Sequence, residues 1–293
     1  MENEKKREKL LTIFLGIFWL LDGILQLQPH MFTPAFINTI LKPNLQNQPP
    51  IITSWINFGI HTFAMHMKID NALFAMVQIL TGALLLLPLS QRWKKFALWI
   101  SIPWAGIIWV FSEGLGNLFT GSASFYMGAP GPVLLYLILA IWLLFPKKLS
   151  LSYLPRVTGL LFFLGGILQE SPMFWTKGMQ SMMWQMSQQD TVSFIAYPAK
   201  TLSSVAIPAS ISNFFAAGIL VILGILLLVK PTKVVGWITV VFLFLIWWIS
   251  QDFGAIFTFP LGTATDPNSA PLFILFLFPL LLSWKSTKLK RST

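Results

Sequence analysis

Acidic and amide side chains are scarce in this chain, and several of them lie where long apolar runs end. Asp22 and Gln26 are four residues apart in the first run, a spacing that places them on one face of a helix. Glu113 and the pair Gln251-Asp252 directly follow two later runs. The helix dipole disfavours an acid at a C-terminal end, so helix stability does not explain these positions. Asp22 predicts proton or cation handling, and the alternative is a structural hydrogen bond to a neighbouring helix. The others predict a ring of polar groups around an outward-facing cavity, and the alternative is solvation at the membrane surface.

Two hydroxyl-rich segments are the second candidate for chemistry. GSAS at 121–124 and GTATDPNSAPL at 262–272 each precede an apolar run that begins with proline. The first N–H groups of a helix have no partner within the helix, and they form a natural site for an anion or a carbonyl oxygen. We therefore expect a ligand site lined by Asp22, Gln26, Glu113, Thr120, Ser122, Ser124, Gln251, Asp252, Thr263, Thr265, Asp266 and Asn268.

Methionines and histidines form a third candidate site. Thioether and imidazole groups suit Cu(I), and four of the methionines recur at helical spacing. The alternative is that these methionines pack on lipid or on other helices, because methionine is a flexible apolar filler. A copper site would draw on His61, Met65, His66, Met179, Met182, Met183 and Met186.

The elements that must position these residues are membrane helices. The chain is 55% hydrophobic and 10% charged, with a mean hydropathy of +0.71. A soluble domain carries about 25% charged residues, and several runs here approach the roughly 20 apolar residues that cross a bilayer. The lipid bilayer is therefore the predicted environment, and we expect a multi-pass protein of the cell membrane.

The net charge of +10 does not indicate nucleic acid, because the basic residues cluster at the termini and in alternate links between apolar runs. This is the positive-inside pattern, and it predicts that both termini are cytoplasmic. The clusters are Lys5, Lys6, Arg7 and Lys9; Arg92, Lys94 and Lys95; Lys147, Lys148 and Arg156; Lys230 and Lys233; Lys285, Lys288, Lys290 and Arg291.

The chain repeats itself at an offset of about 143 positions. LQLQP at 25–29 matches LQESP at 168–172, Trp104 matches Trp247, and EGLGNLFTG at 113–121 matches QDFGAIFTF at 251–259 after a small gap. The fold class is thus all-α with about eight transmembrane helices, as two parallel four-helix repeats at 1–148 and 149–293. The expected helices are 10–28, 71–89, 95–112, 132–145, 156–170, 208–229, 234–250 and 271–284, with amphipathic helices in the outer segments 29–70 and 171–207.

The fourth helix of each half is too short to cross a membrane alone. About fourteen residues give ~21 Å, against a hydrocarbon core of ~30 Å. We expect the preceding segments, 114–131 and 253–270, to re-enter the membrane and line a cavity. The alternative is an ordinary outer loop beside tilted helices.

Each half resembles the DoxX-like family of four-helix membrane proteins, on the residues GIFWLLDGILQLQPHMF and VQILTGALLLLPLSQRWKKFALWISI. The resemblance implies two fused four-helix units. Some members of that family are subunits of quinone-reducing thiosulfate oxidoreductases, so it also implies a bound quinone and a separate redox partner protein. It transfers no catalytic residue.

Three functions remain open. The first is a membrane protein that binds or transports a small solute or ion at an outward-facing site between the repeats. The second is a DoxX-like redox subunit, and the third is a copper-handling variant of the first. We prefer the first because the chain itself contains no redox group; it has no cysteine, and it has no P-loop, dinucleotide fingerprint or zinc-protease motif.

Overall fold

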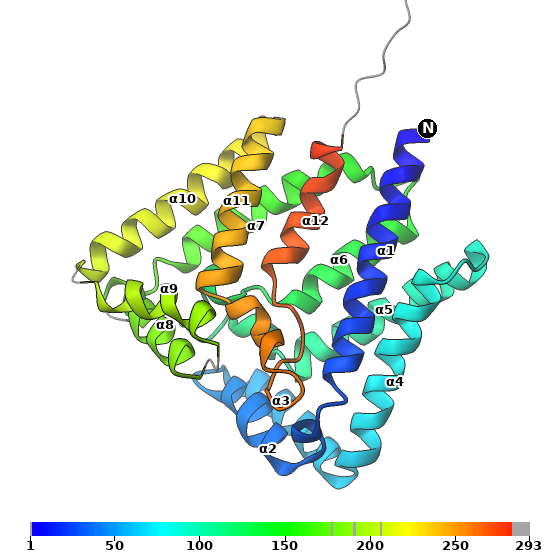
Figure 1. Ribbon diagram of the computed structural model, residues 1–293, viewed down its shortest axis with the longest axis horizontal. Coiled ribbons are helices and arrows are strands. Elements are labelled where there is room, and N and C mark those ends of the chain that lie inside the picture. The colour runs from blue at the N-terminus through cyan, green and yellow to red at the C-terminus, as the bar shows by residue number, and fades with distance from the viewer. Residues whose placement is uncertain (1, 177, 190–191, 206, 283–293) are drawn as a thin grey trace, which may run out of the picture.

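The computed structural model describes residues 2–176, 178–189, 192–205 and 207–282, and within these ranges the chain is helical with no strand. Figure 1 shows the helices fanned around a centre, with the N-terminus at one end of the molecule. The main helices are α1 (Glu2–Leu25), α3 (Pro50–Met65), α4 (Met67–Leu86), α5 (Gln91–Phe111), α6 (Pro132–Leu144), α7 (Leu154–Leu168), α8 (Gly178–Gln189), α9 (Ser193–Ser204), α10 (Ala209–Val229), α11 (Lys233–Ile249) and α12 (Ala270–Leu281).

Short helical turns connect these helices. They are α2 (Pro34–Phe36), η1 (Pro29–Phe32), η2 (Ile37–Leu41), η3 (Lys42–Leu45), η4 (Gly114–Asn117), η5 (Phe125–Met127), η6 (Leu151–Tyr153), η7 (Pro172–Trp175) and η8 (Asp252–Thr258). The expected outer amphipathic helices are present as α3 and α8, and α9 is an additional one. All three lie toward the end of the molecule opposite the N-terminus (Figure 1).

Four of the described helices are long and apolar enough to cross a membrane, which indicates a membrane location. They are α4, α5, α10 and the continuous stretch Leu151–Leu168; α11 with η8 makes a fifth if this pair, bent by 49°, is one span. The helices α6 and α12 are apolar but have 13 and 12 residues. The first helix carries several charges in its opening turns and also Asp22. By length and composition the described helices thus give four or five spans, fewer than the eight expected.

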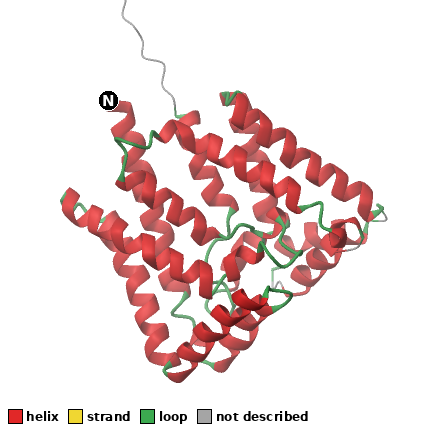
Figure 2. Cartoon of the chain, turned by 180° about the vertical axis from the view of Figure 1, so that it is seen from behind, coloured by secondary structure: helices red, strands yellow, loops and turns green. Residues whose placement is uncertain are grey.

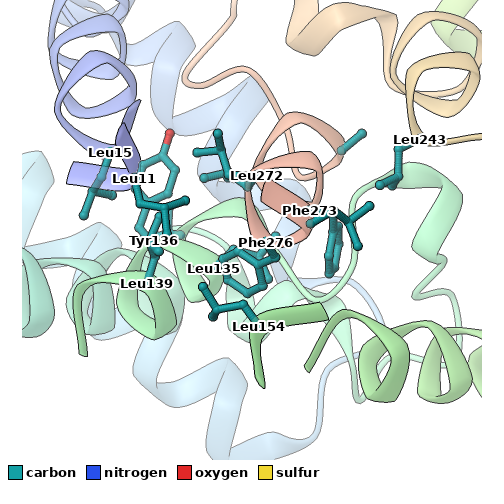
Figure 3. Close-up of a cluster of buried hydrophobic side chains, with 14 of the residues drawn as sticks. Leu11, Leu15, Leu135, Tyr136, Leu139, Leu154, Leu243, Leu272, Phe273 and Phe276 are labelled. Atoms are coloured by element: carbon teal, nitrogen blue, oxygen red, sulfur yellow. The ribbon is translucent and has the colours of Figure 1, made fainter. Parts of the chain in front are cut away.

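The two short helices form the centre of the molecule. Tyr136 of α6 and Phe273 of α12 are fully buried, and Figure 3 shows them among leucines of α1, α6, α11 and α12. The outer helices expose large apolar side chains, such as Phe214 at 64% and Trp237 at 58%. Such a surface is stable against lipid, and burial at the centre explains why α6 and α12 are apolar on every face.

Glycines let the first two long helices of each half pack with their backbones in contact. A Cβ on Gly82 of α4 would lie 2.6 Å from the backbone nitrogen of Leu20 in α1. A Cβ on Gly224 of α10 would lie 2.7 Å from the backbone nitrogen of Phe163 in α7. Small residues permit this close approach in membrane helix pairs. The two glycines are 142 positions apart, one fewer than the offset expected from the sequence.

Candidate functional site

A cavity of about 940 Å³ opens between the loop that follows α5 and the loop that follows α11. Figure 2 shows loops gathered between the helices near the middle of the molecule. Both loops contribute backbone and side chains to the lining, and Thr39, Asn44 and Met182 add to it from η2, η3 and α8. This volume lies at the upper end of the range typical for small-molecule sites.

Each loop begins with the same unusual turn. Residues 114–117 and 252–255 all have positive φ, between 49° and 69°. The left-handed region costs an L-residue roughly 1–2 kcal/mol, yet Leu115 and Phe253 both occupy it. Gly116 lies against the carbonyl of Pro130, and Gly254 against that of Asp266, with no room for a Cβ at either position. The left-handed turns therefore fold each loop back onto the segment that leads into α6 or α12.

Glu113 and Gln251 receive a hydrogen bond from the start of the next short helix. The Val133 N–H donates to Oε1 of Glu113 at 3.3 Å, and the Ala270 N–H donates to Oε1 of Gln251 at 3.1 Å. The dipole of α5 disfavours an acid at the position of Glu113, directly after its C-terminal end. The same carboxyl group lies at the N-terminus of α6, where the helix dipole favours it. Sequence reasoning missed this role, because the two partners come from different helices.

A tryptophan fixes the same loops from the other side. The Trp109 indole N–H donates to the Pro130 carbonyl at 2.8 Å, and the Trp247 indole N–H donates to the Pro267 carbonyl at 2.6 Å. By this contact the counterpart of Trp247 is Trp109, whereas the constant sequence offset had paired it with Trp104. α5 has 21 residues and α11 has 17, so a turn of difference between the helices shifts the register.

Acidic side chains gather at one side of the cavity, with Glu113 and Asp266 in its lining and Asp22 behind them. Asp22 of α1 is 2% exposed, and the Tyr136 hydroxyl donates to its Oδ1 at 3.2 Å. Trp19 packs edge-on against Tyr136 with ring centroids 4.8 Å apart. Asp266 and Glu113 are close enough for their charges to act on Asp22. Asp22 itself does not line the cavity.

The corresponding positions on the other side are apolar. The sequence comparison pairs Asp22 with Gly165, and Phe125 lies directly against Gly165. The ring of Phe125 packs on Phe162 and Phe273, with centroids 4.6 Å and 4.9 Å away. The two sides therefore differ in chemistry, one ionisable and one aromatic.

The carboxyls in the loops have raised pKa values. Burial raises the pKa of Glu113, and the charge of Asp266 raises it further, against the hydrogen bond from Val133. Burial also raises the pKa of Asp266, opposed by hydrogen bonds from the Thr265 hydroxyl at 2.7 Å and from the Asn268 N–H at 2.7 Å. Oε2 of Glu113 is buried and has no hydrogen-bond partner among the described residues.

Gln26 has a different role from the one expected. Its side-chain amide donates to Oδ1 of Asn71, and the Asn71 amide returns a hydrogen bond to the Gln26 carbonyl at 3.0 Å. In the second half, the Gln169 amide donates to Oδ1 of Asn213 at 3.3 Å, and the Asn213 amide donates to the Gln169 carbonyl at 2.8 Å. These reciprocal pairs hold helices together, so Gln26 is engaged away from the cavity.

The cavity gathers most of the other expected site residues. Thr120 does not line it, but its hydroxyl lies 2.7 Å from that of Ser122. Asn44 was not anticipated; its amide donates to the Ser112 carbonyl at 2.6 Å. No sequence signal placed the 39–44 segment here, because its position depends on tertiary packing. The expected residues that line the cavity are Glu113, Ser122, Ser124, Gln251, Asp252, Thr263, Thr265, Asp266 and Asn268.

The residues suggested for copper lie in several environments. His61, Met65 and His66 are exposed on or beside α3. Met179 accepts a hydrogen bond from the Gln169 amide at 3.6 Å, Met182 lines the cavity, and Met183 is 8% exposed. The Met186 side chain lies outside the described residues. In the described part of the chain, no three His, Cys, Asp or Glu side chains are placed to hold a metal ion.

Comparison with known proteins adds no relative: no protein-family model, curated protein or solved structure matches the chain.

Proposed function

We propose that this chain is a multi-pass protein of the cell membrane that binds or transports a small polar solute at an outward-facing cavity. The observation that carries the proposal is the cavity of about 940 Å³ lined by the two loops. Its lining contains hydroxyls, amides and carboxylates with few large apolar side chains, a composition suited to a hydrophilic ligand.

The proposal includes two parallel copies of one four-helix unit, at 1–148 and 149–293. Paired contacts support this division. The glycine crossings, the reciprocal amide pairs, the left-handed turns and the tryptophan bonds each occur once per half. An arrangement of two parallel units places their fourth helices and preceding loops around a shared axis, where repeat transporters bind their substrates.

The proposal also includes eight membrane crossings, with α1, α6 and α12 as three of them. With 13 and 12 residues, α6 and α12 fall about seven and eight residues short of a roughly 20-residue span, which leaves room for the loops before them to re-enter the membrane. The basic links favour a cytoplasmic position for the N-terminal end of the molecule, which places the cavity outside.

The DoxX-like redox subunit and the copper-handling protein stay as predictions. Neither gains support from a particular contact in the described residues. The first would bind a quinone in the same cavity and receive electrons from a partner protein; the second would use the outer methionines. Solute binding explains the hydroxyl and amide lining more simply than either.

The test is ligand-induced stabilisation of the purified chain in lipid nanodiscs. Glucose, glucosamine, glycine, putrescine and sodium chloride would each be added at a concentration high enough to detect weak binding. A ligand at a hundred times its Kd stabilises by about 2.7 kcal/mol. We expect at least one to raise Tm, and we expect Thr263→Trp at the rim to abolish the rise while Ser181→Trp on exposed α8 keeps it. No rise with any probe, or an equal rise in the Thr263→Trp variant, would overturn the proposal.

A further inference from the structure

We propose that the solute carries a protonated amine, and that this amine binds on the side of the cavity formed by Glu113 and Asp266. This inference rests on the proposed function and specifies its ligand. It is supported by the acidic side chains of the described lining, by an oxygen of Glu113 with no partner among the described residues, and by the difference between the two sides.

The charge of the lining is of one sign. Glu113, Asp252 and Asp266 line the cavity, and the described lining contains no lysine, arginine or histidine. A concave surface with acids of one sign concentrates cations, because low-dielectric walls focus the field into the cavity.

Glu113 lines the cavity and has one oxygen with no hydrogen-bond partner among the described residues. Oε1 accepts from the Val133 N–H, whereas Oε2 is buried and lies against Gly131. Leaving a buried acceptor unsatisfied costs about 1–3 kcal/mol, and more when the group is charged. A donor carried by the ligand removes that cost. Both oxygens of Asp266 already accept hydrogen bonds, so Asp266 contributes charge more than an open acceptor.

The acceptors favour an amine over a metal ion or a quaternary ammonium group. No cluster of three candidate metal ligands of the His, Cys, Asp and Glu types occurs among the described residues. A quaternary ammonium group is usually held by aromatic rings, and the described lining has none. A primary ammonium group instead has N–H donors, which suit the carboxylates and the hydroxyls of Ser112, Ser122 and Thr265.

The difference between the two sides orients the ligand. Glu113 in the first half corresponds to the neutral Gln251 in the second, and both hold the start of a short helix. The charges of Glu113 and Asp266 act on Asp22, whereas Phe125 lies against Gly165, the counterpart of Asp22 in the second half. The ammonium group therefore goes to the side of Glu113 and Asp266.

The experiment uses charged thiol reagents and needs no knowledge of the natural ligand. The chain has no cysteine, so Thr263→Cys at the cavity rim provides a single thiol. Ser181→Cys on α8, exposed and outside the lining, is the matched control. Labelling rates of the purified full-length protein in nanodiscs would be measured with a cationic and an anionic methanethiosulfonate at neutral pH. The ratio of the two rates at residue 263 is then divided by the ratio at residue 181.

We expect the normalised ratio to favour the cationic reagent by roughly tenfold, and to approach one when Glu113→Gln and Asp266→Asn are added. A ratio near one in the parent protein, with both reagents reacting, would overturn the amine inference while leaving an open cavity intact. A failure of both reagents to reach residue 263, with residue 181 labelled, would overturn the proposed cavity itself. A tenfold ratio that survives the two substitutions would also contradict the assignment to Glu113 and Asp266.

Discussion

Glu113 and Gln251 occupy equivalent places beneath the two short central helices, one with a carboxylate and the other with an amide. Each accepts a backbone N–H from the following helix through Oε1, at 3.3 Å and 3.1 Å. Both residues therefore support the start of the following helix, but only Glu113 can carry a charge. This separates what the two residues do for the fold from what Glu113 adds to the cavity.

Glu113→Gln should change binding without harming the fold. The glutamine keeps the Oε1 acceptor that Gln251 already uses at the equivalent place, and it removes a buried ionisable group. We expect an unchanged or higher Tm without ligand. We also expect at least tenfold weaker binding, seen as a smaller rise in Tm, of the amine probe that stabilises the parent protein. The comparison is thermal unfolding in nanodiscs with and without that probe. A large fall in Tm without ligand would show that the charge of Glu113 is structural.

Tyr136 and Asp22 should behave as a coupled pair. The Tyr136 hydroxyl donates to the buried Asp22 carboxyl, so Tyr136→Phe leaves an acceptor unsatisfied and should cost about 1–3 kcal/mol of stability. Asp22→Ala removes that acceptor, and the double variant should cost clearly less than the sum of the two single changes. Unfolding free energies in detergent would measure the cycle, with Tyr153→Phe at an exposed position as a neutral control. Strict additivity would contradict the pairing.

The two reciprocal amide pairs should contribute alike to stability. Asn71→Leu and Asn213→Leu each remove one residue of a buried pair and leave a glutamine without its partner. We expect a loss of about 1–3 kcal/mol for each, because both amides are fully buried. Unfolding of the two variants under identical conditions provides the measurement. A cost at Asn71 with none at Asn213 would argue against equivalent halves.

Stability without ligand should fall as the pH rises. The pKa values of Glu113 and Asp266 are raised above their ordinary 4.5 and 3.8, so the folded chain retains protons that the unfolded chain releases. Their contribution is complete below the ordinary carboxyl pKa and is lost as the pH rises through the raised values. Asp22 and Tyr136 are the other ionisable groups whose charges interact with this pair.

The matched measurement is Tm against pH for the parent protein and for the Glu113→Gln, Asp266→Asn double variant. The double variant should show the smaller slope. Amine binding should have the opposite dependence, since protons compete with the ammonium group, and it should weaken as the pH falls. Equal slopes in the two proteins would mean that these carboxyls do not titrate as described.

Sequence patterns predicted the helical class and the two outer helices, because long apolar runs and helical periodicity are local properties. Comparison of the two halves also predicted that residues of the two loops, such as Glu113 and Asp266, line one site. Helix boundaries were less accurate. α1 begins at Glu2, although residue 10 was expected, because the charged residues before the apolar run continue the helix.

Other features could not be read from the sequence. The role of Gln26 depends on Asn71, which is 45 positions away and is brought near by the packing of α1 on α4. The left-handed backbone at Leu115 and Phe253 gives no composition signal. The 39–44 segment reaches the cavity only through tertiary contacts. The repeat itself stays a prediction, supported by these paired contacts.

Labelling from one side of the membrane shows whether the cavity faces outward. Cells expressing the chain with Thr263→Cys in the cavity, or with Ser90→Cys in the basic link between α4 and α5, would be treated with a membrane-impermeant thiol reagent. We expect labelling of residue 263 in intact cells and labelling of residue 90 only after permeabilisation. Labelling of residue 90 from outside, with residue 263 protected until the cells are opened, would contradict it.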